Sequence, residues 1–340
     1  MSKPRILYTP IPEHTGKVFS GETFKQLLET FDVTLNENGV NYTISQVAYK
    51  IRGYDGLITG WGAAPLTEEV FKNADRLRII THSAGSVKYM LSREVFERYI
   101  VPKGICVFSA RESIAYNVAE STIGYLIMGC RRFIDHALAF REHGIWRDPR
   151  VQVNGQFLMG SIVGVIGASK VGREVIRLLK TFDVRILLYD PYVSESEAER
   201  LGVEKNELNV LLSRADFVTL HAPLTPETYR MIGEKELKLI KDGALLVNTS
   251  RGGVIDYKAL IQECTSSRIY VVLDVTDPEP LPADSPLRHL SNVIITPHIS
   301  GAGYYGYFRI GASTLKALQD FFAGKPVEGA VKLEEYDIMA

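Results

Sequence analysis

Short β-rich runs alternate with helix-compatible segments along almost the whole chain, and this alternation constrains the fold more than any other feature. In the second half the runs are continuous and apolar, as expected of strands buried on both faces of a sheet. Such runs cover residues 5–9, 55–59, 77–81 and 104–108, then 161–166, 184–189, 216–220, 244–248, 269–274 and 292–296. Strands that alternate with helices form parallel sheets, so the sequence predicts an α/β protein.

The length of 340 residues predicts two domains, because a single hydrophobic core stops growing before that size. Residues 117–132 are mostly apolar and compatible with a helix, which we expect to continue to about Arg141. This helix is either buried or lies at a subunit interface. A second, amphipathic helix is predicted over residues 304–322, ending at Gly324, and we expect it to return to the first domain.

Composition and charge exclude several classes of protein. The net charge is −1 and basic residues are scattered, which argues against nucleic acid as a partner. No stretch approaches the roughly 18 apolar residues of a membrane helix, and the first ten residues are typical of a strand, not of a signal peptide. Cys106, Cys130 and Cys264 are far apart and match no zinc spacing, so we expect a cytoplasmic protein without a metal site.

Residues 161–190 carry the strongest local signal. They read as a buried strand, a glycine-containing turn, an amphipathic helix and a second strand that ends at Asp190, which is the dinucleotide-binding βαβ pattern. Gly167 permits the tight turn, Gly172 permits close packing of the helix on the strand, and the helix N-terminus can bind a pyrophosphate. Asp190 can accept hydrogen bonds from the adenosine ribose and would repel a 2′-phosphate, so the pattern favours NAD over NADP.

Ser169 occupies the middle position of the G-x-G-x-x-G pattern. Glycine there normally lets the backbone approach the pyrophosphate, so the serine either shifts the phosphate or binds it through its hydroxyl. We expect Gly167, Ser169, Lys170 and Val171 to contact the cofactor. The alternative, an ordinary strand-to-helix turn, is disfavoured by the complete βαβ context.

Polar segments follow three of the predicted strands, at the ends where open parallel sheets bind ligands. They are NTSRGGVID at 248–256, DVTDPEPLP at 274–282 and TPHISG at 296–301. Together with HAPLTPET at 221–228, these ordered motifs resemble the D-isomer-specific 2-hydroxyacid dehydrogenase family, and the resemblance runs from about residue 55 to residue 301.

The resemblance implies two Rossmann-like domains. A doubly wound parallel-sheet domain at residues 108–298 would bind NAD, and it would be inserted in a flavodoxin-like substrate-binding domain formed by residues 1–107 and 299–340. The implied activity is the NAD-dependent interconversion of a small 2-oxo acid and a D-2-hydroxy acid.

Matched residue by residue, the family's substrate-binding arginine falls on Arg251, its acidic partner on Glu279 and its acid/base histidine on His298. The guanidinium can hold a carboxylate with paired hydrogen bonds. Imidazole titrates near neutrality, so His298 can donate a proton as hydride reaches the carbonyl carbon, while Glu279 orients the ring and stabilises its protonated form. Taken singly, each residue could instead be structural; their joint order favours catalysis.

The resemblance implies further contacts. The substrate carboxylate would bind backbone N–H groups of Ala84, Gly85 and Ser86, and the cofactor would contact His221, Ala222, Pro223, Thr228, Thr249, Ser250 and Asp274. Asp274 corresponds to the strand-end carboxylate that contacts the nicotinamide amide. His221 is treated as part of a loop over the cofactor, without a role in proton transfer.

Other residues depart from the family's pattern. The loop after Ser86 continues with Val-Lys-Tyr at 87–89 in place of a small acidic signature, so the substrate is not predicted. Trp61 either walls the pocket or is packed in the core, and the same alternatives hold for Tyr304, Tyr305 and Tyr307. His82 is a further candidate for substrate contact. The remaining histidines, His14, His136, His143 and His289, have no supporting context.

One other function remains open, and Glu279 argues against a second. Some relatives of this fold resemble corepressors that sense a dinucleotide and assemble with other proteins, which is the alternative to an enzyme. A formate-type dehydrogenase would carry an amide where this chain has Glu279. The expected partners are a small-molecule acid and a second copy of the chain, which we expect to dimerise through the helix at 117–129.

Overall fold

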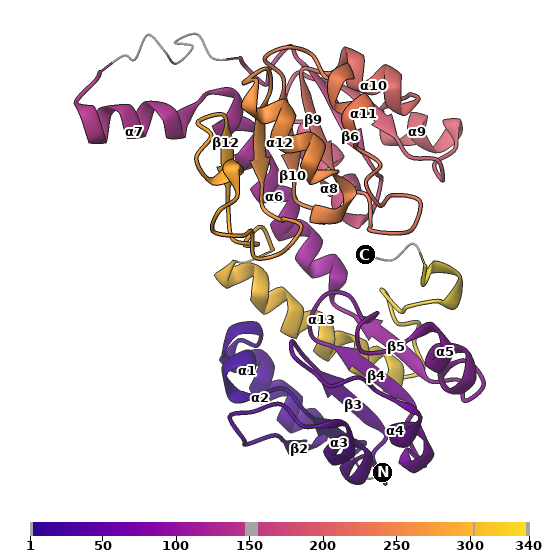
Figure 1. Ribbon diagram of the computed structural model, residues 1–340. Helices are drawn as coiled ribbons and strands as arrows, with labels where there is room; N and C mark the ends of the chain where they lie inside the picture. The colour runs from indigo at the N-terminus through magenta and orange to yellow at the C-terminus, as the bar shows by residue number, and fades with distance from the viewer. Residues whose placement is uncertain (1–2, 147–155, 302, 338–340) are drawn as a thin grey trace. The chain divides into compact units, whose positions relative to one another are not determined.

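The computed structural model describes residues 3–146, 156–301 and 303–337, which form two compact units (Figure 1). The first unit joins Met1–Ile114 to Ala302–Met339, and the second spans Ala115–Gly301. Both contain a wholly parallel sheet with interleaved helices, which confirms the predicted α/β class. Among the described residues, no helix has the length and apolar character needed to cross a membrane.

The sheet of the first unit has five strands in the order β2-β1-β3-β4-β5. Its strands are β1 Arg5–Tyr8, β2 Asp32–Leu35, β3 Gly56–Thr59, β4 Ile79–His82 and β5 Cys106–Ser109. This is the flavodoxin-like order, with its switch point between β1 and β3. Four strands overlap predicted runs, but β2 was missed because its side chains alternate between exposed and half-buried and form no apolar run.

Helices cover both faces of this sheet. They are α1 Pro12–Val18, α2 Gly21–Thr30, α3 Ile44–Lys50, α4 Glu68–Asn73, α5 Arg93–Val95, the π-helical turn η1 Phe96–Ile100, α13 Tyr304–Phe322 and the 3₁₀ turn η4 Leu333–Glu335. Leu57 and Ile80 pack with α3 and α4, whereas Ile58 and Ile79 pack with α2 and α13 on the opposite face. The C-terminal helix α13 therefore has its predicted bounds and returns to the first unit as expected.

The second unit contains seven strands in the order β12-β11-β10-β9-β6-β7-β8. They are β6 Ile162–Ile166, β7 Arg185–Tyr189, β8 Glu204–Lys205, β9 Phe217–Leu220, β10 Leu245–Asn248, β11 Tyr270–Leu273 and β12 Val293–Ile295. This is the doubly wound Rossmann order with one added strand, and its switch point lies between β6 and β9.

Helices also cover both faces of the second sheet. They are α6 Arg111–Cys130, which begins in the first unit, α8 Lys170–Leu179, α9 Glu195–Leu201, α10 Leu208–Arg214, α11 Glu234–Leu239, α12 Tyr257–Thr265 and the 3₁₀ turns η2 Gly252–Val254 and η3 Pro286–Arg288. A further helix, α7 Phe133–His143, follows α6 and extends away from the sheet (Figure 1). Leu246 and Val271 pack with α10, α11 and α12, while Val247 and Val272 pack with α6 and α8. Polar ligands must therefore bind at the ends of the strands.

The single helix predicted from residue 117 to about Arg141 is wrong, because the chain forms α6 and α7 with a break between them. Arg132 adopts a left-handed conformation with φ 54°, which ends α6. Its guanidinium lies 2.7 Å from the Asp135 carboxylate and 3.8 Å from the centroid of the Tyr270 ring. The break is held by tertiary contacts that the local sequence does not reveal.

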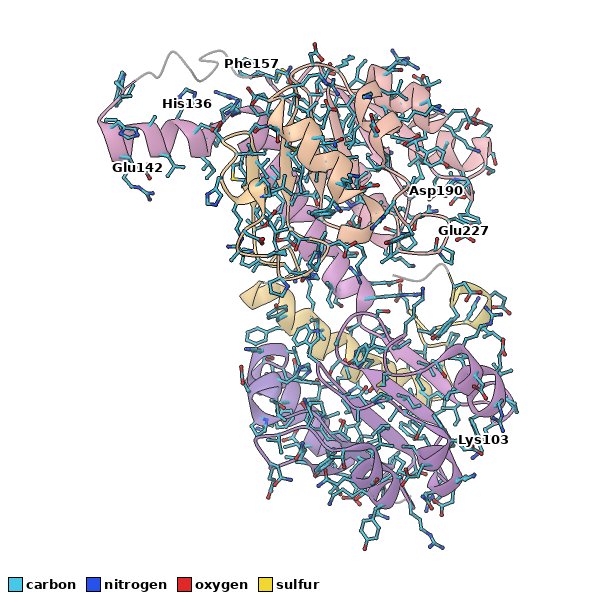
Figure 2. All side chains as sticks on the ribbon, viewed as in Figure 1. Lys103, His136, Glu142, Phe157, Asp190 and Glu227 are labelled. Atoms are coloured by element: carbon cyan, nitrogen blue, oxygen red, sulfur yellow. The ribbon has the colours of Figure 1, made fainter. Side chains whose placement is uncertain are left out.

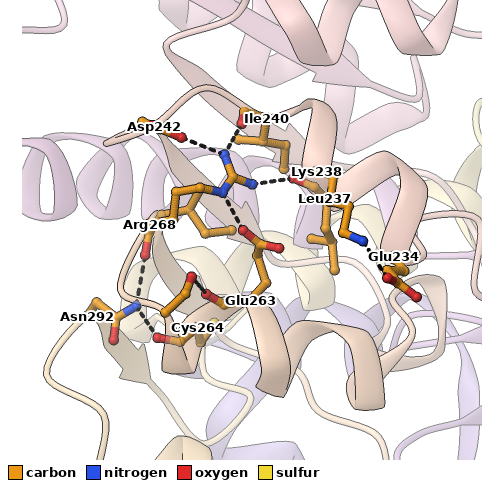
Figure 3. Close-up of polar contacts among 11 residues, drawn as sticks. Glu234, Leu237, Lys238, Ile240, Asp242, Glu263, Cys264, Arg268 and Asn292 are labelled. Atoms are coloured by element: carbon orange, nitrogen blue, oxygen red, sulfur yellow. Dashed lines mark hydrogen bonds and ion pairs between the residues drawn. The ribbon is translucent and has the colours of Figure 1, made fainter.

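Polar contacts brace the end of the second sheet at which β11 and β12 begin (Figure 3). The Arg268 guanidinium is 2.5 Å from the Glu263 carboxylate and 3.0 Å from the Asp242 carboxylate. The Asn292 amide donates to the Ile269 carbonyl at 2.8 Å, directly before β12. These contacts fix the two strands whose opposite ends carry the segments with Glu279 and His298.

Candidate active site

The turn between β6 and α8 has the shape expected of a dinucleotide site. Gly167 has φ +94°, and a Cβ there would lie 2.6 Å from the Ala222 nitrogen. A Cβ at Gly172 would lie only 2.0 Å from the Gly167 carbonyl oxygen. Both positions therefore require glycine, and the close approach that they permit brings the first turn of α8 to the end of β6.

Ser169 is the N-cap of α8. Its hydroxyl oxygen accepts a hydrogen bond from the Gly172 N–H at 3.3 Å. Serine is a favoured N-cap residue, so the sequence contained this signal in addition to the two alternatives considered for the phosphate. Lys170 and Val171 belong to the first turn of α8, and the backbone N–H groups at a helix N-terminus suit an anion.

Asp190, which is labelled in Figure 2, directly follows β7. One carboxylate oxygen accepts from the Ala168 N–H at 2.7 Å, and the other accepts from the Tyr192 N–H at 2.8 Å. These two bonds fix the orientation of the carboxylate. A carboxylate can accept about four hydrogen bonds, so two positions are left for hydroxyl donors.

The loop after β9 is held by its own polar side chains. The buried His221 ring bonds the Thr219 hydroxyl through Nε2 at 2.9 Å, and burial lowers its pKa to about 3. The Thr228 hydroxyl donates to the Pro223 carbonyl at 2.6 Å and accepts from the Thr225 N–H at 2.8 Å. His221 is therefore neutral, and its exclusion from proton transfer stays a prediction.

The three predicted catalytic residues follow three neighbouring strands. Arg251 follows β10, Glu279 follows β11 and His298 follows β12. The His298 Nδ1 lies 2.5 Å from the Glu279 Oε1, with 49% and 43% of the two side chains exposed. Burial lowers the pKa of Arg251, and the negative charge of nearby Glu279 opposes that shift. His298 and Glu279 also line a cavity of about 630 Å³.

The main-chain conformation at His298 is held by Asp274. His298 has φ 53°, and its N–H donates to the Asp274 carbonyl at 2.8 Å. One oxygen of the Asp274 carboxylate accepts from the Thr296 hydroxyl at 2.7 Å and the Ile299 N–H at 2.9 Å, and the other accepts from the Ser300 N–H at 2.9 Å. This carboxylate fixes the segment that carries His298, a role that the sequence did not suggest.

The Asp274 side chain is ionised although it is buried, with an exposed fraction of only 2%. Burial raises the pKa of its carboxyl, but the hydrogen bonds from Ser300 and Thr296 outweigh that effect and lower it. The same carboxylate also accepts from the Ser300 hydroxyl and, at 3.3 Å, from the Tyr125 hydroxyl. Together with the three bonds above, these exceed the roughly four that a carboxylate can accept, so a contact with a nicotinamide amide would compete with the bonds that hold the His298 segment. That predicted contact stays a prediction.

The backbone around Arg251 depends on close packing. A Cβ at Gly252 would lie 2.1 Å from the Thr276 carbonyl, so the loops after β10 and β11 meet backbone to backbone. The Ser250 hydroxyl donates to the Asn248 side chain at 2.9 Å. Thr249 contacts the Thr122 hydroxyl of α6 at 3.1 Å. Ser250 and Thr249 thus have structural partners in addition to their predicted contact with the cofactor.

The predicted substrate loop of the first unit follows β4. Ala84 is fully buried, the Gly85 carbonyl accepts from the Ser109 hydroxyl, and the Ser86 hydroxyl accepts from the Lys88 N–H at 3.4 Å. The side chains of Tyr304 and Tyr305 lie outside the described residues. Across the described parts of the chain, no group of three histidine, cysteine or acidic residues could hold a metal ion.

A doubly wound sheet with a glycine turn and a strand-end acid defines the second unit as a dinucleotide-binding domain. The sequence model for the D-isomer specific 2-hydroxyacid dehydrogenase NAD-binding domain matches residues 123–300. The chain belongs to the D-isomer specific 2-hydroxyacid dehydrogenase family and carries its NAD-binding domain.

Named relatives agree with this family. A D-3-phosphoglycerate dehydrogenase of Methanocaldococcus jannaschii is 34% identical over 87% of this chain, which spans only 55% of that relative. A glyoxylate reductase of Korarchaeum cryptofilum is 33% identical over 95% of this chain and 94% of its own length. The crystal structure of D-lactate dehydrogenase from Escherichia coli has a TM-score of 0.69 at 26% identity, covering 97% of this chain and all of that chain.

Proposed function

We propose that this protein is an NAD-dependent oxidoreductase that interconverts a small 2-oxo acid and the corresponding D-2-hydroxy acid. The observation that carries the proposal is the 2.5 Å contact between His298 Nδ1 and Glu279 Oε1, with Arg251 nearby. A corepressor-like protein that only senses a dinucleotide needs no such acid/base pair, so the pair favours an enzyme.

Each of the three side chains has a distinct task. Bound NADH supplies the hydride for the carbonyl carbon. Arg251 holds the substrate carboxylate with charge-assisted hydrogen bonds. Because Glu279 bonds Nδ1 of His298, Nε2 is the nitrogen that gives its proton to the carbonyl oxygen as negative charge grows there. In the oxidation direction the same nitrogen takes the proton from the hydroxyl group.

The second unit suits a dinucleotide. The cradle of Gly167 and Gly172 and the first turn of α8 would hold the pyrophosphate, and Asp190 would hold the adenosine ribose. The fixed carboxylate of Asp190 favours NAD, because a 2′-phosphate beside it would meet a like charge.

Further contacts belong to the same proposal. The first unit would bind substrate through backbone N–H groups of residues 84–86. The cofactor would contact residues 221–223, Thr228, residues 249–250 and Asp274. None of these assignments requires a metal ion.

We further propose that the protein forms a homodimer, with α7 as the contact surface in place of α6. Most apolar side chains of α6 are buried or half-buried, and Ile123 and Leu126 lie in the core of the second unit. By contrast, α7 projects from the body of the second unit (Figure 1) and exposes Phe133, Ile134, Leu138 and Phe140. A symmetric pair of such helices would cover these side chains.

Sedimentation tests this contact surface. If the unaltered protein sediments as a dimer and the Phe140→Asp variant as a monomer, the result would support α7 as the contact surface. A monomeric unaltered protein would exclude it.

The test of the enzymatic proposal follows NADH absorbance with a panel of 2-oxo acids. Glyoxylate, pyruvate, hydroxypyruvate and phenylpyruvate cover small, polar and aromatic side chains. We expect turnover of at least one acid, and for every acid other than glyoxylate, whose product is achiral, we expect the D-hydroxy acid as product. Tight NADH binding without turnover of any acid would instead support the sensing protein.

A further inference from the structure

Three rings meet at the carboxyl end of the sheet in the first unit. Trp61 follows β3, His14 lies in α1 and Tyr307 lies in α13. The Trp61 ring centroid is 4.9 Å from that of His14 and 5.3 Å from that of Tyr307, and both contacts are edge-on. This site adjoins the switch point between β1 and β3, where open parallel sheets bind ligands. Trp61 remains 38% exposed there.

The backbone around Trp61 is shaped to hold this side chain. A Cβ at Gly60 would lie 2.5 Å from His14 Nε2, so glycine lets the imidazole pass beneath the end of β3. Gly62 has φ +75°, and a Cβ there would lie 2.4 Å from the Asn41 amide. That amide donates to the Trp61 carbonyl at 3.4 Å. The neighbouring residues thus fix the orientation of the indole, so its exposed face is a preformed surface for recognition.

The imidazoles beneath this surface are neutral. The Ser83 hydroxyl donates to the Thr59 carbonyl at 2.7 Å, so it must accept from His14 Nε2–H across their 3.0 Å contact. His14 is 4% exposed, and its Nδ1 has no hydrogen-bond partner among the described residues. The fully buried His82 bonds the Thr59 hydroxyl through Nδ1 at 2.9 Å. Burial lowers the pKa of His14 to about 4 and that of His82 to about 3.

The cations on the surrounding elements already have partners. Lys17 of α1 lies 2.7 Å from the Glu13 carboxylate, and Lys88 donates to a backbone carbonyl of the C-terminal segment at 2.9 Å. Arg111 and Arg309 also interact with other groups of the chain. Burial raises the pKa of the Tyr307 phenol, although Lys17 lies close enough to lower it by a smaller amount. An anionic group placed against the rings would lose part of its hydration and would have to compete with the Glu13 carboxylate for this exposed ammonium, which is unfavourable.

On the basis of the proposed 2-oxo acid reductase function, we propose that Trp61 and Tyr307 form the specificity surface for the substrate side chain, and that this side chain is uncharged and aromatic. A flat ring can make edge-to-face and offset contacts with an indole and a phenol. The protein would then prefer a 3-aryl-2-oxo acid to a phosphorylated one. This would distinguish it from the phosphoglycerate dehydrogenases to which it is similar.

The test compares kcat/KM for NADH-dependent reduction of phenylpyruvate, glyoxylate and 3-phosphohydroxypyruvate. We expect phenylpyruvate to exceed the phosphorylated acid by at least about tenfold, and Trp61→Ala to lower the ratio of phenylpyruvate to glyoxylate by about ten- to a hundredfold. Trp61→Phe should retain most of that ratio. Tyr307→Leu is a second variant of the same surface, in case Trp61→Ala does not fold. Tyr49→Ala removes an 86% exposed tyrosine of α3 and is the matched control.

The possible results separate the two proposals. Turnover of glyoxylate by a protein whose phenylpyruvate ratio does not change in Trp61→Ala or Tyr307→Leu would overturn the specificity surface and leave the reductase function standing. Preference for the phosphorylated acid would overturn it as well. Reduction of pyruvate or hydroxypyruvate but of none of these three acids would likewise overturn only the specificity surface. Failure to reduce any of these three acids or any acid of the earlier panel, with NADH still bound, would contradict the reductase function and with it this inference.

Discussion

Histidines at the ends of the two sheets lie in opposite environments. In the first unit His14 and His82 are buried against hydroxyl groups, and burial keeps them uncharged. In the second unit His298 is half-exposed and pairs with the Glu279 carboxylate. Both sheets are parallel and doubly wound, so the fold explains only where polar residues gather. Their surroundings decide which can move a proton, and on this basis we propose that the acid/base chemistry belongs to the second unit.

Removing the Arg251 guanidinium from the second unit should have the largest effect on kcat/KM. We expect Arg251→Gln to lower kcat/KM by about 10²–10³-fold, because paired charge-assisted hydrogen bonds to the substrate carboxylate are lost. Arg251→Lys should recover only part of the loss, since an ammonium cannot bind both oxygens in the same way. Arg185→Gln, which alters an exposed ion pair with Glu204, is the control and should leave steady-state rates unchanged.

The charge at the end of β7 should determine the choice of cofactor. We expect the unaltered protein to use NADH about a hundredfold better than NADPH, because Asp190 would lie beside the 2′-phosphate. Asp190→Ser should reduce this preference by accepting the phosphate and weakening the ribose contact. Equal use of both cofactors by the unaltered protein would contradict the assignment.

Acid should destabilise the first unit more than the second. His14, His82 and His221 have folded pKa values of about 4, 3 and 3, below the ordinary 6.5. Between pH 6.5 and the folded value, the unfolded chain binds a proton that the native chain does not, so the free energy of unfolding falls as pH falls. Each buried histidine should remove about 2 kcal/mol between pH 6.5 and 5.

Two of these three histidines lie in the first unit. Hydrogen exchange in urea at pH 7 and pH 5 can follow β4 and β9 separately. We expect the protection of backbone amides to fall further in β4 than in β9. An equal loss in both strands would contradict a greater acid sensitivity of the first unit.

The smallest effect is expected at Asp274. Asp274→Asn puts an NH₂ group against the N–H donors of the His298 segment, so that one buried hydrogen bond cannot form. We expect kcat to fall about tenfold, which corresponds to the free energy of one such lost bond. Thr296→Val removes a single bond to the same carboxylate and should have a weaker effect. If Asp274 acts chiefly on the nicotinamide, the Kd for NADH would rise instead.

Much of the second unit could be predicted from its sequence. Its long strands are continuous apolar runs, and the polar segments after β10, β11 and β12 follow directly from them. The two-residue strand β8 has no such run and was missed. The left-handed Arg132 was missed too, because its conformation depends on Tyr270, which is far away in the sequence.

The surroundings of His14 could not be predicted. It bonds Ser83, 69 residues further along the chain, and it contacts Trp61 through a gap left by Gly60. No local spacing indicates such a contact, and only the order of strands in the sheet creates it. The family motifs likewise indicated which residues gather after β10–β12, but not that Asp274 holds their last segment in place.

The most direct measurement of the central claim is the turnover of His298→Asn. Asparagine tolerates the left-handed φ of 53° at this position, so it removes the imidazole without the strain that alanine would add. We predict a fall in kcat of at least about a hundredfold, typical of a lost general acid, with the Kd for NADH unchanged. Near-normal turnover in this variant would contradict the role of His298 and the assignment of chemistry to the second unit.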